Sequence, residues 1–297
     1  MPRSRLQQSL ACHGNPSGAS EPVVLLVPGS TLTPEANFQW NYIPALLDLG
    51  RTVCTVELPE KAMGDIQVAA EHLVFAIRDL SARSGQPIQI VGYSQGGMVP
   101  RWALRFWPST RAQVSDLISL AGSHKGTVTA IPSCLDRCAP AFWQQRQDSA
   151  FMAALNRDGQ ETWPEVHYTS AYTRYDEVVF PNFAAEVANS RLAGGDNVAN
   201  IELQSVCPLN SAEHLAIGTY DPVGWALAKD ALMNEGPADP SRVSLETCLQ
   251  LTMPGVDQST FLQDFTETVA FIGETSGNAE QVDEEPPLAC YATENGC

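Results

Sequence analysis

Residues 89–97 read Q-I-V-G-Y-S-Q-G-G, an apolar run followed by a serine between glycines. The run before Gly92 is typical of a buried strand, and the spacing from Gly96 to Phe106 indicates a helix directly behind it. Strand and helix can approach this closely only where residues lack a Cβ. A bare G-x-S-x-G also occurs in ordinary glycine-rich loops, but the flanking strand and helix favour Ser94 as a nucleophile on a sharp turn. Pro100 removes a donor early in this helix, so we expect a distorted turn there.

Further along the chain, strand-like and helix-like segments alternate. Apolar or β-branched runs predict strands at 23–27, 51–56, 87–91, 114–120, 166–169 and 200–204, and helical spacing predicts a long helix over 66–82. This order is typical of α/β proteins with a mostly parallel central sheet and helices on both faces. We find no internal repeat and no dividing linker, so residues 1–297 are expected to form a single domain.

The C-terminal part has its own character. Residues 251–297 are expected to contain a helix followed by an acidic tail, since residues 258–272 have helical spacing and residues 274–289 are polar and acidic. Phe261, Leu262, Phe265 and Val269 share one face of this helix, which we interpret as core packing rather than a lipid-facing surface.

The charge of the chain limits its partners. A net charge of −17 disfavours nucleic acid and anionic membranes, which would repel this surface. No apolar run approaches the roughly 20 residues of a membrane-spanning helix, so no integral membrane association is expected.

The chain contains eight cysteines. Their spacing does not match a zinc site, and we expect neither a metal nor a cofactor. An even number favours four disulfides in an oxidising compartment, although the sequence alone leaves the pairing open. Because the N-terminal residues lack the apolar core of a signal peptide, we interpret the chain as a mature, secreted protein whose leader has been removed.

A serine nucleophile needs a base, and His214 is the best candidate among five histidines. In chains of this kind the order is serine, acid, histidine. His13 and His72 precede Ser94, His124 precedes any suitable acid, and His167 lies at a strand edge where a structural role is expected. His214 lies in a polar loop near the end of the alternating pattern, where the last catalytic loop belongs.

The acid that orients the base should follow the strand before His214. Asp176 lies just beyond the strand region at 166–173, with Glu177 as its competitor. Asp136 and Asp158 are interpreted as solvated surface acids. Donors for an oxyanion are expected at the backbone N–H groups of Gln95 and Ser30, with the Ser30 hydroxyl as a possible third.

Beyond these residues, several stretches make the chain similar to the Candida antarctica lipase B family of α/β-hydrolases. They occur in family order over about residues 10–250: L-L-V-P-G at 25–29, Q-W-N-Y-I-P at 39–44, Y-S-Q-G-G at 93–97, F-W-P-S at 106–109, H-K-G-T-V at 124–128, W-Q-Q at 143–145, D-E-V-V at 176–179, S-V-C at 205–207 and E-H at 213–214. The resemblance implies an α/β-hydrolase fold with Ser94, Asp176 and His214 as the catalytic residues and Ser30 and Gln95 as the oxyanion hole.

The resemblance also implies pairings and a pocket. It implies disulfides Cys12–Cys54, Cys207–Cys248 and Cys290–Cys297, which leaves Cys134–Cys138 as an added bridge. The first ties down an N-terminal arm at 1–20, and the added bridge falls in a lid-like segment at 131–150. Gln145, Val178 and Val179 would line the acyl side of the pocket.

Four residues depart from the family pattern. Tyr93 stands in place of a tryptophan at the floor of the alcohol-side pocket, Gly92 in place of a bulkier residue, Ser30 in place of a threonine, and Ser123 in place of an aspartate near the acyl site. These departures concern substrate preference rather than the reaction.

The sequence therefore predicts a secreted, monomeric serine lipase that acts on triacylglycerols and other esters through an acyl-enzyme and can transesterify. A short-chain esterase or polyester hydrolase with the same triad is the alternative within hydrolases. A catalytically silent binding protein of the same fold is disfavoured, because the full set of residues is present.

Overall fold

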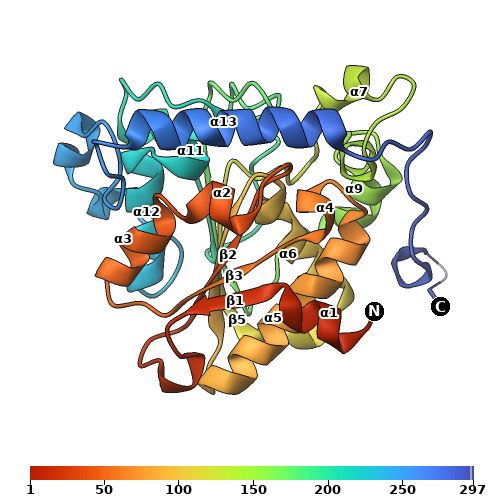
Figure 1. Ribbon diagram of the computed structural model, residues 1–297, viewed down its shortest axis with the longest axis horizontal. Helices are drawn as coiled ribbons and strands as arrows, with labels where there is room; N and C mark the ends of the chain where they lie inside the picture. Colours follow the sequence, from red (N-terminus) through yellow and green to blue (C-terminus); the bar gives the residue numbers. More distant parts are fainter. Residues whose placement is uncertain (295) are drawn as a thin grey trace.

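The computed structural model describes residues 1–294 and 296–297, which form one seven-stranded sheet covered by helices (Figure 1). The strand order is β1-β3-β2-β4-β5-β6-β7, and every pair is parallel except β1 with β3. The predicted α/β-hydrolase class with a mostly parallel sheet is confirmed. The strands are β1 (Leu10–His13), β2 (Val24–Val27), β3 (Val53–Val56), β4 (Ile88–Tyr93), β5 (Val114–Leu120), β6 (His167–Tyr172) and β7 (Val198–Glu202).

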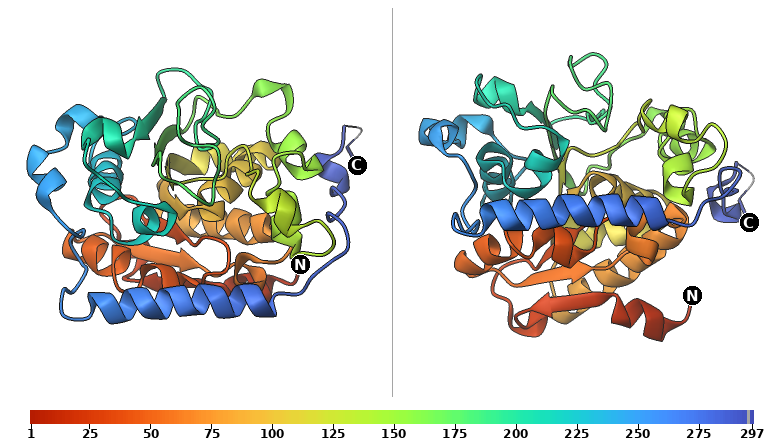
Figure 2. Two further views of the ribbon diagram at one scale, coloured as in Figure 1. Left: turned by 90° about the horizontal axis from the view of Figure 1, so that it is seen from above. Right: turned by 45° about the horizontal axis from the view of Figure 1, so that its top comes forward.

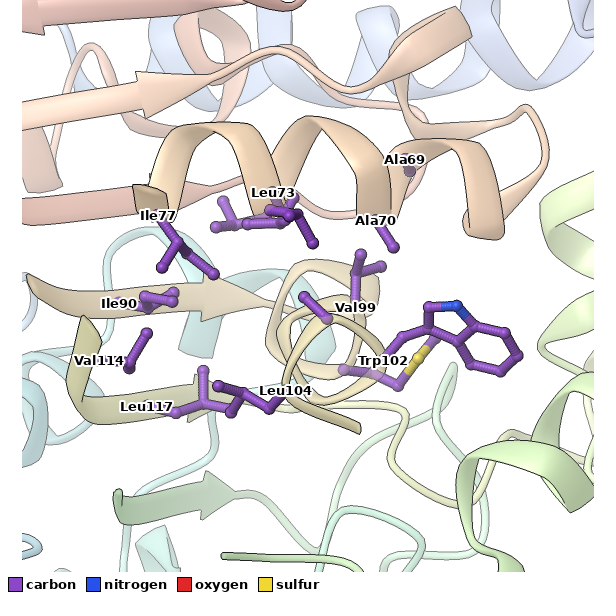
Figure 3. Packing of buried hydrophobic residues seen from close by; sticks show 14 of the residues in the cluster. Ala69, Ala70, Leu73, Ile77, Ile90, Val99, Trp102, Leu104, Val114 and Leu117 are labelled. Atoms are coloured by element: carbon purple, nitrogen blue, oxygen red, sulfur yellow. The ribbon is translucent and has the colours of Figure 1, made fainter. Parts of the chain in front are cut away.

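Two layers of helices bury the two faces of the sheet. On one face, α5 and α6 pack apolar side chains such as Leu73 and Val99 against Ile90 (Figure 3). On the other face, α2, α3, α11 and α12 cover Val24, Leu26 and Val91. The longer helices are α3 (Tyr42–Asp48), α5 (Ile66–Ser84), α6 (Gln95–Phe106), α12 (Pro222–Met233) and α13 (Phe261–Asn278); the shorter ones are α1 (Arg3–Gln8), α2 (Pro34–Phe38), α4 (Pro59–Ala62), α7 (Ala130–Ser133), α8 (Pro140–Gln144), α9 (Ala150–Leu155), α10 (Leu203–Val206) and α11 (His214–Thr219).

Several predicted boundaries are corrected by the structure. Strand β1 was not foreseen, because only four partly exposed residues form it and their pattern is weak. The last strand ends at Glu202, and Gln204 belongs to α10, where its amide is held by Thr173 and the carbonyl of Asn210. Helix α6 runs through Pro100 without a break, so the expected distortion does not interrupt it.

Helix α13 lies across the molecule along one side of the α2 and α11 region (Figures 1 and 2). It continues to Asn278, so residues 274–278, which were expected to belong to the acidic tail, are helical. Thr268 and Thr275, two turns apart, are buried and fix this face against the body. The core interpretation is wrong for Leu262 and Val269, which are 75% and 46% exposed.

After α13 the chain runs beside the α7–α9 region and is hydrogen-bonded to it (Figure 1). Val282 pairs with Cys138, and its carbonyl accepts the Trp143 indole N–H at 3.1 Å. The Glu285 carboxylate accepts the N–H groups of Ala150 and Phe151 at 2.9 and 2.8 Å. This acid therefore caps the N-terminus of α9, where unpaired N–H groups favour negative charge. We name residues 279–289 the strap.

Four disulfides join the chain: Cys12–Cys54, Cys134–Cys138, Cys207–Cys248 and Cys290–Cys297. Three of these are the pairs that the family resemblance implies, and Cys134–Cys138 is the added bridge that they leave over. Cys12–Cys54 ties the edge strand β1 to β3, which accounts for a strand of four residues at the sheet edge. Among the described residues, no helix has the length and apolar character needed to cross a membrane.

Arg101 is a fully buried cation in α6. It donates to the carbonyls of Glu161 and His124 at 2.9 and 3.1 Å and to the Asn156 side-chain oxygen at 2.8 Å. Burial lowers its pKa to about 10, which still leaves it charged at neutral pH. It fixes the segments after β5 and α9 to the helix behind Ser94.

We expect Arg101→Met to lower the free energy of unfolding by about 3 kcal/mol, since buried carbonyls lose a charged donor. Arg105→Met is the matched control, because Arg105 donates to the carbonyls of Gln160 and Arg157 from a partly exposed position. Its cost should stay below about 1 kcal/mol. Urea unfolding of both variants measures the difference, and equal costs would contradict the argument from burial.

Candidate active site

Ser94 lies on a strained turn between β4 and α6. Its φ of 54° and ψ of −121° are rare for a residue with a side chain. A Cβ on Gly92 would come within 2.0 Å of the Gly96 carbonyl oxygen, and one on Gly96 within 2.2 Å of the Val27 carbonyl oxygen. The two glycines are therefore required for the close packing that projects Ser94 from the turn.

The structure brings Ser94, His214 and Asp176 together, although they lie on three separate segments. His214 Nε2 is 3.0 Å from Ser94 Oγ, and its Nδ1 is 2.9 and 3.0 Å from the two oxygens of Asp176. His214 is the first residue of α11, and Asp176 lies in the loop after β6. All three side chains are buried.

Asp176 is held by the chain around it. The N–H groups of Val178 and Val179 donate to its Oδ1 at 3.0 and 2.7 Å, and Asn182 Nδ2 donates to its Oδ2 at 3.3 Å. These donors fix the orientation of the carboxyl group, so it can orient an imidazole. Val178 and Val179 were predicted to line the pocket, and their backbone contribution to Asp176 was not foreseen.

Two further carboxylates lie beside His214. Glu177, the competitor for the acid role, accepts the backbone N–H of His214 at 3.2 Å instead of contacting the ring. Glu213 caps the N-terminus of α11 through the N–H groups of Leu215 and Ala216. Burial alone would lower the pKa of His214, but the charges of Asp176, Glu177 and Glu213 and the hydrogen bond to Asp176 outweigh it, so the pKa is raised.

The other four histidines have different surroundings. His124 is fully buried and has its pKa lowered well below the ordinary value by burial and by the nearby Arg101. His72 lies in α5, where burial lowers its pKa to about 4. His167 is paired with Asp116 at 3.6 Å, as expected of a structural residue, and His13 ends β1.

Ser30 lies in the loop after β2 and accepts two hydrogen bonds. Gln95 Nε2 and Gln145 Nε2 donate to its Oγ at 2.9 and 3.0 Å. Two donors occupy the lone pairs of a hydroxyl oxygen, so the Ser30 proton is left free to donate elsewhere. Gln95 also donates to the Ala62 carbonyl at 2.8 Å, which anchors this arrangement to α4.

Ser123 has a different place from the one expected. It is 1% exposed and donates to Gln145 Oε1 at 2.9 Å, so it supports the pocket wall from behind. A short side chain here cannot reach past Gln145 to the substrate. What it does is orient the Gln145 amide, whose nitrogen then points to Ser30. The sequence offered no signal for this contact.

A cavity of about 460 Å³ opens above Ser94 and His214. Most of its wall is apolar, with Ser30, Gln145 and Glu177 among the polar groups. Val269, Ile272 and Ser276 of α13 form one side, which sequence analysis missed although the apolar stripe of this helix was recognised. The apolar lining residues are Leu32, Tyr93, Ala130, Phe142, Val178, Val179, Leu215, Val269 and Ile272.

Tyr93 forms the floor of this cavity beside His214, with 5.2 Å between the ring centres. Its ring is enclosed on both edges: a Cβ on Gly29 would lie 2.8 Å from Cδ1, and one on Gly218 would lie 2.0 Å from Cδ2. The size of this side chain is therefore matched to two glycines that were not singled out from the sequence.

A second hollow on the surface lacks the residues of a catalytic site. A hollow of similar volume between α1 and α5 is lined mainly by Arg3, Glu71, Arg78, Asp79 and apolar residues, and it offers no serine, histidine or cysteine. Over residues 1–294 and 296–297, no group of three or more His, Cys, Asp or Glu side chains is arranged to hold a metal ion.

Comparisons with known proteins show which family the chain resembles. The family model of palmitoyl protein thioesterases matches residues 53–186. Lipase B of Pseudozyma antarctica is 40% identical over 219 residues, which cover 72% of this chain and 62% of that protein. The chain thus spans less than two thirds of the length of this curated relative.

Solved structures extend the likeness. The crystal structure of Aspergillus fumigatus lipase B has a TM-score of 0.88 and 27% identity, and the match covers 99% of this chain and 72% of that one. A Bacillus licheniformis lipase in its propeptide form has a TM-score of 0.54 and 18% identity, over 77% of this chain and 54% of that one, and shares the fold alone. The 40% identity to one lipase B over 72% of this chain, with the structural match to another over 99% of this chain, establishes that the chain belongs to the lipase B family of α/β-hydrolases.

Proposed function

We propose that this protein is a serine carboxylic-ester hydrolase of lipase type. The observation that carries the proposal is the hydrogen-bonded series Ser94–His214–Asp176, which opens into an apolar cavity of about 460 Å³. Cavities of this size hold small organic ligands, and an apolar wall suits an acyl chain better than a sugar or a nucleotide. Two relatives are named as lipases, which supports the same activity here.

In the proposed reaction, Ser94 Oγ attacks the ester carbonyl while His214 Nε2 takes its proton. Asp176 holds the imidazole in orientation and stabilises its charged form. The backbone N–H groups of Ser30 and Gln95 and the free proton of the Ser30 hydroxyl would stabilise the negative oxygen of the tetrahedral intermediate. His214 then protonates the leaving alcohol, and water or a second alcohol resolves the acyl-enzyme, which gives hydrolysis or transesterification.

The proposed substrates are triacylglycerols and other esters with an apolar acyl group. The alternative, a short-chain esterase or polyester hydrolase, uses the same residues and differs only in what the cavity accepts. The match to palmitoyl protein thioesterases adds a palmitoyl thioester as a substrate to be tested. Four disulfides support secretion into an oxidising compartment. We propose that the secreted protein acts as a monomer.

We expect Ser94→Ala to lower the turnover of a p-nitrophenyl ester by at least about 1,000-fold, since the nucleophile is lost. Labelling of the native protein by a fluorophosphonate, located by mass spectrometry, should fall on Ser94. Circular dichroism of the variant provides the control for folding. Turnover within about tenfold of the native protein would contradict the assignment of Ser94.

The pH dependence should reflect the raised pKa of His214. Activity needs the neutral imidazole, so kcat/KM should rise with pH through a pKa above the ordinary histidine value of about 6.5. Glu177→Gln removes one of the charges that raise this pKa, so the acid limb should move to lower pH. Glu246→Gln changes an exposed acid in residues 245–249 and should leave the limb in place. An unmoved limb in Glu177→Gln would remove the electrostatic argument.

Acyl preference tests the cavity wall that α13 supplies. Val269→Glu places a charge on this wall and should lower the hydrolysis of soluble p-nitrophenyl octanoate by about tenfold, while acetate hydrolysis stays within twofold. Leu262→Glu, on the same helix but outside the cavity lining, is the control. Repeating the native chain-length series with emulsified esters separates lipase from esterase, because only a lipase is expected to favour long chains at an interface.

A further inference from the structure

Asn37 is a completely buried amide in the short helix α2, and the proposed mechanism gives it no role. Its Oδ1 accepts the backbone N–H of Gly29 at 3.2 Å, and its Nδ2 donates to the backbone carbonyl of Gly218 at 3.3 Å. One side chain thus joins two segments that are 189 positions apart, since 218 minus 29 is 189. One of these segments continues into Ser30, and the other belongs to the helix that begins at His214.

Gly29 immediately precedes Ser30, whose N–H and hydroxyl are the proposed oxyanion donors. A Cβ on Gly29 would lie 3.2 Å from Ser94 Cβ, so this backbone also borders the nucleophile. The position of the Gly29 peptide therefore sets where the Ser30 donors lie relative to the serine.

Gly218 is four residues after His214 in α11, one turn along the same helix. Its carbonyl would ordinarily accept the N–H of the residue four positions on, but that residue is Pro222, which has no N–H. The Asn37 amide supplies the missing donor. A buried carbonyl without a partner would cost free energy, so this contact is fixed rather than incidental.

The Tyr93 ring lies between the two joined segments. Gly29 meets one edge of the ring and Gly218 the opposite edge, each at less than the distance that a Cβ would need. Tyr93 prevents the segments from approaching, and Asn37 prevents them from separating. The ring between the two segments and the hydrogen bonds of Asn37 to both of them together fix the distance between the segments.

We propose that Asn37 is a positioning residue that holds the oxyanion loop at a fixed distance from the helix that carries His214, with Tyr93 as the spacer. The proposal rests on the proposed function, because it assumes that Ser30 and His214 act on the same reacting carbonyl. It follows that a change at Asn37 acts on kcat more than on KM, since the geometry matters most in the transition state.

The test uses Asn37→Asp and Asn37→Ser in the full chain, assayed with a soluble p-nitrophenyl ester. An ionised aspartate still accepts the Gly29 N–H but offers no donor to the Gly218 carbonyl and repels it. A serine is too short to reach both groups. We expect kcat to fall by about 10- to 100-fold in each variant, with KM changed by less than about threefold.

Asn37→Asp carries a further signature in its pH dependence. Burial raises the pKa of a carboxyl group, and the protonated acid can donate to the Gly218 carbonyl again. The kcat of the variant relative to the native protein should therefore rise as the pH falls. A negative charge that acted only by raising the pKa of His214 would make this ratio fall instead. The other titratable groups on the elements near Asn37 are the same in the native protein and in the variant, so their titration cancels in the ratio of kcat values. These groups are Glu35, Tyr93, Glu213, His214, Tyr220, Asp264 and Glu267.

Asn200→Asp is the matched control. The Asn200 amide accepts the N–H of Leu192 at 2.7 Å and donates to the carbonyl of Leu192 at 2.9 Å, the same pair of bonds at the sheet-edge strand β7. This variant should lose thermal stability with kcat within twofold of the native value at every pH. Both Asn37 variants should remain folded by circular dichroism.

Three outcomes would overturn the positioning role of Asn37. They are native kcat in both Asn37 variants, a ratio of Asn37→Asp kcat to native kcat that is flat or falls with decreasing pH, and unfolding of both variants. None of these affects the proposed function, which fails separately if fluorophosphonate does not label Ser94 in the native protein.

Discussion

The contact between β4 and α6 is the constraint on which the rest of the site depends. Backbone meets backbone there, because Gly92 and Gly96 leave no room for a side chain. This contact holds Ser94 in a strained conformation with positive φ, in which its hydroxyl lies 3.0 Å from His214 Nε2. It also places the first N–H groups of α6 beside the serine, where an anion is favoured. The position of Ser94 and that of the Gln95 N–H, a proposed oxyanion donor, are thus both consequences of this one contact.

The other groups arrive because parallel strands end at the same edge of a sheet. Ser94 follows β4, Ser30 follows β2 and Asp176 follows β6, so these loops converge although their residues are far apart in sequence. His214 is added by a helix that begins at the histidine itself. The sheet supplies rigidity, and the loops supply the chemistry.

Much of this arrangement could be predicted from the sequence because it depends on local patterns. The strand before Gly92, the glycines around Ser94 and the chain order of Asp176 and His214 all have short-range signals. The side of the cavity formed by α13 could not be predicted, because an apolar stripe on a helix does not indicate which neighbouring element it packs against. Asn37 gave no signal either, because both of its partners are backbone groups remote in sequence. Ser123 stands where the family pattern has an aspartate, so the resemblance did not predict its hydrogen bond to Gln145.

The strap has a consequence for the entrance of the cavity. Helix α13 lines one side of the cavity with Val269 and Ile272. Helices α7 and α8 contribute Ala130, Ser133 and Phe142 to the lining. The strap begins at the end of α13. Four residues after Asn278, Val282 pairs with Cys138 and accepts a hydrogen bond from Trp143, both in or next to α8. This short segment therefore joins the two sides of the cavity, by the chain itself and by hydrogen bonds. The strap restrains α13 at its Asn278 end, and Phe261 packs against Trp40 and Tyr220 at the other end, so both ends of this cavity-lining helix are held to the body of the protein.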